Sequence, residues 1–197
     1  MVKDIINECL ILLDDNSLKE KIKNVKLKGT LETELTGLSE TEKNTIKLLV
    51  ENLKNVINSI TRSYLKNYTI ERIKSDNEGK ITLSSFSRPV IGIKNVSDSM
   101  NNYIVYKTFF DHIKVPFSNM DFDVCYNFET EEFNSLFDEV DVPLGLTSYC
   151  LALGVVSVYY QIKLLYSEAE LFESKFKAEL HDIKPSLGTR SFFVWRN

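Results

Sequence analysis

The sequence predicts an α+β fold: a helical bundle from the N- and C-terminal helices, with an inserted antiparallel β meander or small sandwich. Apolar residues recur at helical spacing over residues 2–65 and 143–182, and they alternate with polar residues over 68–128. The 197 residues are 43% hydrophobic and 26% charged, which suits a folded domain rather than a disordered chain. We expect a single α+β domain over residues 1–182, followed by a C-terminal docking arm over 183–197.

The clearest element in the N-terminal part is a long helix from about Glu40 to Leu65. A short helix from about Val2 to Leu13 and a weaker one from Ser17 to Lys28 are expected before it. Ser39 and Glu42 form a capping-box pair at its start. Its apolar residues recur at spacings of three and four and so form one stripe, made of Ile46, Leu49, Val50, Leu53, Val56, Ile57, Ile60 and Tyr64.

The β insertion consists of short alternating runs with turn residues between them. The turn Asp76–Gly79 separates the first two runs, and no segment of helix length separates any of them. Antiparallel pairing is therefore expected, because parallel strands need long crossover connections. In the last run Phe122, Val124, Tyr126 and Phe128 share one face of a strand. The runs are expected at 68–73, 81–83, 90–96, 103–108, 112–115 and 120–128.

Two more helices are expected after an acidic linker. Asp141 and Pro143 are expected as the N-cap and an early proline of a helix over Leu144–Tyr166. This segment is apolar almost all round, so the helix should be buried on several sides. The last helix is expected to have a cap at Ser167, an inner stripe at Ala169, Phe172, Phe176 and Leu180, and an end at Pro185 and Gly188.

Charge and cysteine content restrict the class of protein. The net charge of −4 argues against a surface built to hold nucleic-acid phosphates. Cys9, Cys125 and Cys150 include no close pair, so we expect buried free thiols in a reducing compartment and no disulfide framework. The N-terminus lacks the basic start and cleavage site of a signal peptide. The most apolar stretch, Tyr149–Tyr160, is too short to span a bilayer, so no membrane association is expected.

No catalytic, cofactor or metal site is expected, and the chain is not expected to be an enzyme. His112 and His181 have no His or Cys partner at metal-ligand spacing. The acidic stretch from Glu129 to Asp141 lacks the alternating ligands and central glycine of a calcium loop. A paired-carboxylate site in that stretch stays open as an alternative.

The C-terminal arm is the most unusual segment. From Ile183 onward it carries three basic residues and no acidic one. Such a basic segment with large aromatic residues is typical of protein interfaces. The alternative is that the aromatic residues fold back onto the chain's own core. The candidate partner-binding residues are Arg190, Phe192, Phe193, Trp195 and Arg196.

Several segments along most of the chain share features with one protein family. These are Leu38–Glu40, Gly79–Phe86, Val96–Tyr106, Tyr149–Val155, Glu168–Glu173 with Phe176, and the basic-aromatic end. Through them the chain resembles the head–tail connector, or adaptor, proteins of tailed bacteriophages. The resemblance implies a helical bundle with a β insertion.

The resemblance also implies a structural role in the virion. Such a protein is made in the host bacterial cytoplasm and self-associates into a ring, a dodecamer in this family, beneath the portal at the head–tail junction. The ring would contact the portal protein and the next neck or tail protein, and DNA would pass through its lumen without specific binding. Two alternatives stay open: another neck or tail structural protein, and a non-viral protein-binding regulatory domain.

Overall fold

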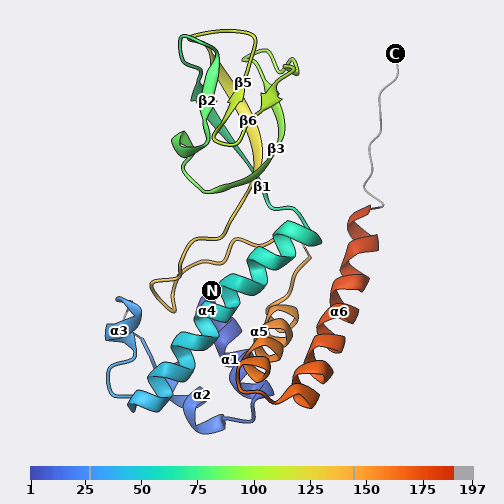
Figure 1. Ribbon diagram of the computed structural model, residues 1–197. Helices are drawn as coiled ribbons and strands as arrows, with labels where there is room; N and C mark the ends of the chain where they lie inside the picture. The colour runs from blue at the N-terminus through green and yellow to red at the C-terminus, as the bar shows by residue number, and fades with distance from the viewer. Residues whose placement is uncertain (27, 144, 189–197) are drawn as a thin grey trace. The chain divides into compact units, whose positions relative to one another are not determined.

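The computed structural model describes residues 1–26, 28–143 and 145–188, with side chains up to Ile183. Within these residues lie six α-helices and two three-stranded antiparallel sheets, which confirms the predicted α+β class (Figure 1). The chain divides into two compact units. The helical unit comprises Met1–Ile60 and the chain from Glu132 onward, and the β unit comprises Thr61–Glu131. The β unit is therefore inserted into the sequence of the helical unit.

The N-terminal helices are α1 (Val2–Leu12), α2 (Asn16–Lys23), α3 (Leu31–Glu34) and α4 (Glu40–Ser63). Three of them follow the prediction, with α2 five residues shorter at its C-terminal end than expected. The short helix α3 has no apolar stripe that would predict it. Its Glu34 is only 7% exposed and accepts hydrogen bonds from the Ser135 hydroxyl (2.5 Å) and the Leu136 amide (2.7 Å). This long-range contact holds the segment after the β unit in place.

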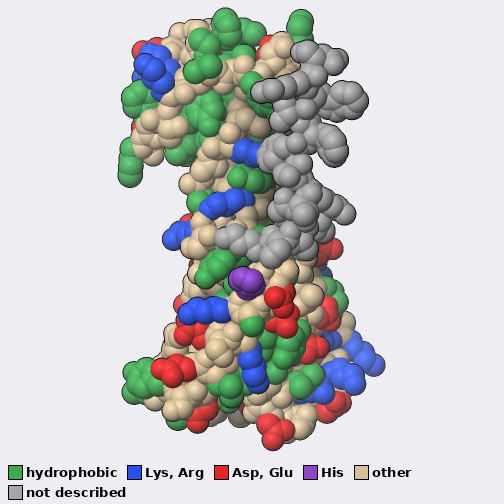
Figure 2. All heavy atoms as spheres, turned by 90° about the vertical axis from the view of Figure 1, so that its right-hand side faces the viewer, with side chains coloured by type: hydrophobic (Ala, Val, Ile, Leu, Met, Phe, Trp, Pro, Cys, Tyr) green, Lys and Arg blue, Asp and Glu red, His purple; other side chains and the backbone are tan. Residues whose placement is uncertain are grey.

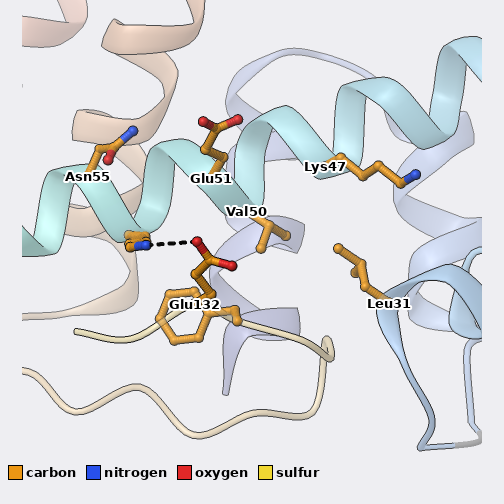
Figure 3. A pocket seen from close by; sticks show the side chains of 8 residues that line it. Leu31, Lys47, Val50, Glu51, Asn55 and Glu132 are labelled. Atoms are coloured by element: carbon orange, nitrogen blue, oxygen red, sulfur yellow. Dashed lines mark hydrogen bonds and ion pairs between the residues drawn. The ribbon is translucent and has the colours of Figure 1, made fainter. Parts of the chain in front are cut away.

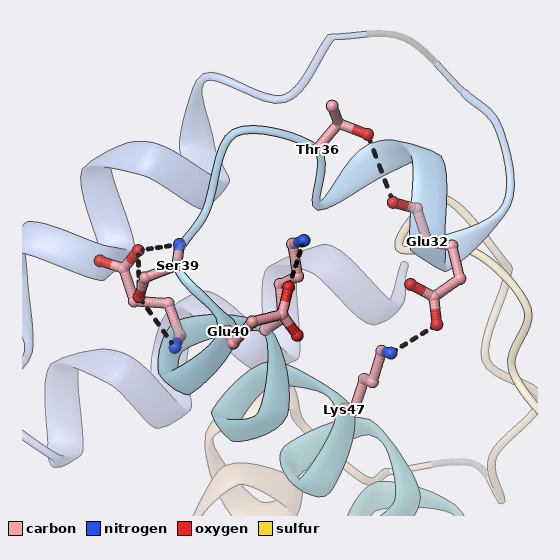
Figure 4. A network of polar contacts seen from close by, with 7 residues as sticks. Glu32, Thr36, Ser39, Glu40 and Lys47 are labelled. Atoms are coloured by element: carbon pink, nitrogen blue, oxygen red, sulfur yellow. Dashed lines mark hydrogen bonds and ion pairs between the residues drawn. The ribbon is translucent and has the colours of Figure 1, made fainter.

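The predicted capping box begins α4. The Glu42 amide donates to Ser39 Oγ (3.3 Å), and the Ser39 amide donates to Glu42 Oε2 (2.9 Å), so both ends of the pair are satisfied. Lys21 Nζ donates to the other oxygen of Glu42 at 2.6 Å, and this bond holds the pKa of the Glu42 carboxyl below its usual range. Further ion pairs between Lys47 and Glu32 and between Lys43 and Glu40 surround this end of the helix (Figure 4).

The core of the helical unit joins the two ends of the chain. Leu53 of α4 and Val156 of α5 (Ser148–Ile162) are both fully buried. At Gly154 the contact is so close that an added Cβ would lie 2.9 Å from Val56 Cγ1 and 3.0 Å from Phe176 Cε2. Helices α4, α5 and α6 (Tyr166–Gly188) therefore meet at this glycine. The predicted bundle of N- and C-terminal helices is confirmed.

The last two helices differ from the prediction at their ends. Helix α5 begins at Ser148, where Thr147 Oγ1 accepts from the Cys150 amide (3.1 Å), and not at Leu144 after Asp141. Gly145 has a positive φ of 98°, which a continuous right-handed helix does not allow. Helix α6 begins at Tyr166, one residue before the expected cap Ser167. It continues past Pro185 and ends at Gly188, so of the two residues expected to end the helix only Gly188 does so.

The β unit contains strands β1 (Tyr68–Lys74), β2 (Lys80–Thr82), β3 (Val90–Ser97), β4 (Lys107–Thr108), β5 (His112–Lys114) and β6 (Asp121–Phe128). The sheet orders are β1-β6-β3 and β2-β5-β4, so the first strand pairs with the last. Of the two predicted arrangements, this order fits the small sandwich and not a simple meander. The expected strand at 103–108 shrinks to Lys107–Thr108, with one bridge between Tyr103 and Ser97.

Both sheets contribute to one core, as expected for a small sandwich. The alternating residues Phe122, Val124, Tyr126 and Phe128 are all buried on one face of β6, which confirms the predicted strand face. Ile81 and Ile113 from the second sheet join the same cluster. Phe86 packs edge-on against Tyr126, with ring centroids 4.7 Å apart.

Candidate functional site

The five partner-binding residues predicted from the sequence lie outside the described residues. Arg190, Phe192, Phe193, Trp195 and Arg196 all follow Gly188, where the described chain ends. The choice between docking on a partner and packing on the chain's own core therefore stays a prediction. The described residues offer other surfaces.

The cysteines lie in environments that disfavour the reactive thiolate. Cys9, Cys125 and Cys150 are all buried and free. Burial raises the pKa of each thiol, in the case of Cys150 to about 11. A nucleophilic cysteine needs a lowered pKa, so these three behave as small apolar side chains.

The histidines and carboxylates of the described chain form local pairs. His112 Nδ1 lies 2.7 Å from Asp111 Oδ1, and this hydrogen bond holds the pKa of the Asp111 carboxyl below its usual range. The His112 ring also stacks on Phe109, with centroids 4.6 Å apart. Among the described residues no group of three His, Cys, Asp or Glu side chains could hold a metal ion. None of the described helices has the length and apolar content needed to cross a bilayer.

A pocket of about 260 Å³ lies in the helical unit beside α4 (Figure 3). Charged side chains of both signs line it. Lys54 Nζ lies 3.2 Å from Glu132 Oε1 on the other side of the pocket, and Lys47 pairs with Glu32, which lies outside the lining. A drug-sized ligand usually needs a larger and more apolar cavity. The pocket is therefore better explained as a solvated groove between α4 and the segment that Glu34 holds in place. It is lined by Leu31, Lys47, Val50, Glu51, Lys54, Asn55, Glu132 and Phe133.

Large apolar side chains project from two loops of the β unit. The side chain of Phe110 is fully exposed and that of Val105 is 87% exposed. The two loops lie on either side of the short strand β4 along the chain, and exposed apolar side chains that together form a patch mark protein-interaction surfaces. We call this set the β-unit apolar loops; it comprises Met100, Tyr103, Val105, Phe109 and Phe110.

Hydrogen bonds hold both loops in a defined conformation. Asp98 Oδ1 accepts from the amides of Met100 (2.8 Å) and Asn102 (2.9 Å), and its Oδ2 accepts from the Asn102 side chain (3.0 Å). The second loop is closed by a hydrogen bond from the Phe109 amide to the His112 carbonyl (2.8 Å). The backbone that carries the exposed apolar side chains is thus pre-organised, which lowers the entropy cost of ordering these loops on binding.

A second apolar surface lies at the turn between α5 and α6. We call it the α5–α6 corner and define it by Ile162, Leu164, Leu165 and Tyr166, all exposed. Leu164 is 68% exposed and has a positive φ of 60°. A hydrogen bond from the Leu165 amide to the Tyr160 carbonyl (3.0 Å) closes the end of α5. Glycine usually occupies such a left-handed position after a helix, because it has no Cβ to strain.

The sequence pattern does not reveal either surface. The expectation of a helix buried on several sides holds only for Cys150–Ser157; the residues from Gln161 to Tyr166 are exposed. Gln161 and Lys163 interrupt the apolar run and are the one signal that could have indicated its exposed end. Figure 2 shows acidic side chains beside hydrophobic ones on the surface of the helical unit.

Comparison with known proteins found neither a matching protein-family model nor a similar curated protein.

Proposed function

We propose that the chain is a structural protein of a virion, a head–tail connector or adaptor. It forms a ring under the portal, extends the DNA channel and joins the capsid to the neck or tail. The observation that carries the proposal is the pair of exposed apolar surfaces, one on each unit and both on ordered backbone. Exposed apolar side chains on an ordered backbone suit a protein that acts by binding other proteins.

The architecture also supports the proposal. A bundle of N- and C-terminal helices with an inserted antiparallel β unit is the arrangement that the resemblance to phage connectors implies. A ring subunit contacts a neighbour on each side and further proteins above and below it. Several separate docking surfaces are therefore expected, and the chain offers the β-unit apolar loops, the α5–α6 corner and the predicted C-terminal arm.

The charge of the chain suits a DNA channel. The net charge is −4, and like charge between the wall and the phosphates opposes adhesion of DNA as it slides through. The expected partners are the portal protein, the next neck or tail protein and further copies of this chain.

Electron microscopy of the full chain with a portal protein tests the proposal. The portal would be the one encoded near this chain in the same genome. We expect rings of this protein on one face of the portal, and loss of those rings when Phe110→Asp and Leu164→Asp are combined. A genome with no portal gene near this one, or portals that stay bare at high protein concentration, would refute the connector role.

A further inference from the structure

Leu164 is unfavourable in the isolated chain for two reasons. Its left-handed backbone strains a residue with a Cβ, and its apolar side chain is 68% exposed to water. Glycine at this position would remove both penalties. A side chain that is costly in the free protein and stands among three other exposed apolar side chains is best explained by a partner that covers it.

We propose that the α5–α6 corner binds the C-terminal arm of a second copy of this chain. This deepens the proposed connector function, because it names the contact between neighbouring subunits of the ring. The arm residues involved are Arg190, Phe192, Phe193, Trp195 and Arg196.

The composition of the two surfaces is complementary. From Tyr166 to Ile183 helix α6 carries five acidic and two basic residues, and Glu168 and Glu170 are exposed within one turn of the corner. The arm after Gly188 carries two arginines and no acidic residue. Its three aromatic side chains can bury apolar surface against the apolar side chains of the corner. Arginine and tryptophan are also the residues that contribute most often to binding energy at interfaces.

The arm is too short to reach the corner of its own copy, so the arm that binds there must come from another copy. The 23 residues of α6 span about 33 Å at 1.5 Å per residue, and the corner lies at the end opposite Gly188. An extended chain covers at most about 3.6 Å per residue, so Phe192 lies within about 14 Å of Gly188 and Trp195 within about 25 Å. Neither aromatic residue can reach its own corner. The contact therefore joins different surfaces of two copies, and repetition of such a contact closes into a ring when the rotation allows it.

Photo-crosslinking of the full-length protein tests which segment covers the corner. Tyr166→p-benzoylphenylalanine introduces the photoreactive group, and equal amounts of ¹⁴N- and ¹⁵N-labelled protein are mixed at high concentration before irradiation. We expect crosslinked peptides from the arm in which the corner and the arm carry different isotope labels. Crosslinks to the arm of the same label alone, or to no part of the arm, would overturn the proposal. The same group placed at Val105 provides the control and should not capture the arm.

The variant Leu164→Gly separates binding from folding. It should melt at the same or a higher temperature than the parent, because the strained backbone is relieved. It should weaken self-association at least tenfold in sedimentation experiments, because the apolar contact is lost. Ile70→Ala shortens a side chain that is 69% exposed, from the β unit and outside both apolar surfaces, and should leave self-association unchanged. Unchanged association of Leu164→Gly would refute the contact. Mixed-label crosslinks in a protein that never binds a portal would support the contact and refute the connector function.

Discussion

At Gly154 the helix contact is close enough for a single added methyl group to test it. Alanine there would place its Cβ 2.9 Å from Val56 Cγ1 and 3.0 Å from Phe176 Cε2, distances at which one of the helices or the Phe176 ring has to move. Overpacking of this kind costs about 1–3 kcal/mol. Alanine gains about 1 kcal/mol over glycine in helix propensity. We therefore expect Gly154→Ala to destabilise the helical unit by about 1 kcal/mol.

Thermal unfolding followed by far-UV circular dichroism measures this change. A loss of about 1 kcal/mol lowers the melting temperature by roughly 2–4 °C in a protein of this size. Gly92→Ala is the matched control, because its added Cβ would meet no atom within 4 Å. Val56→Ala combined with Gly154→Ala should show favourable coupling of about 1 kcal/mol, since the clashing methyl group is absent. A Gly154→Ala protein that melts above the parent would show that α4, α5 and α6 do not meet as described.

Three further predictions concern the core, a loop and the arm. Leu53→Ala should lower the free energy of unfolding by about 2–5 kcal/mol, because the side chain is fully buried; a parent-like denaturant midpoint would contradict its place in the core. Hydrogen bonds from Asn102 hold the pKa of the Asp98 carboxyl below its value in the unfolded chain, which is about 3.9. The ionised carboxylate therefore stabilises the loop fully above about pH 3.9. This stabilisation is lost as the pH falls through the pKa of the folded state. Hydrogen exchange at the Met100 and Asn102 amides should therefore be faster in Asp98→Asn than in the parent at neutral pH, and the difference should shrink in acid; equal rates at neutral pH would contradict this role. Removal of residues from Thr189 onward should leave the melting temperature nearly unchanged and abolish incorporation into particles, whereas an unfolded truncated protein would place the aromatic residues in the chain's own core.

Local signals predicted much of the fold. The spacing of Ile46, Leu53 and Ile60 defines the buried stripe of α4, and the pair Ser39 and Glu42 marks its start, because both depend on residues close in sequence. The alternation from Phe122 to Phe128 likewise gives the buried face of β6. These elements could be predicted because their own residues decide them.

The features that the sequence did not predict depend on distant parts of the chain. The pairing of β1 with β6 joins residues more than forty positions apart, such as Ile73 and Phe122. Neither strand contains a local sequence signal that specifies which strand it pairs with. Helix α3 depends on Glu34 and its partners Ser135 and Leu136, about one hundred residues later. The exposure of the α5–α6 corner was not predicted, because the sequence pattern of an apolar residue is the same whether the protein's own core or a partner covers it.

The insertion of the β unit also governs the order in which the helical unit can fold during synthesis. Cys9 Sγ of α1 lies 4.0 Å from the Ala152 carbonyl oxygen of α5, a contact that spans 143 positions in the sequence. At about 5–20 residues per second, a ribosome needs roughly 7–30 s to make the intervening chain. During that time the apolar faces of α1 and α4 have no C-terminal helices to cover them, while the β unit emerges complete. Nascent chains that end at residue 140 and carry a C-terminal linker long enough to clear the ribosome exit tunnel should consequently bind chaperones through the N-terminal helices, even when the β unit has already folded.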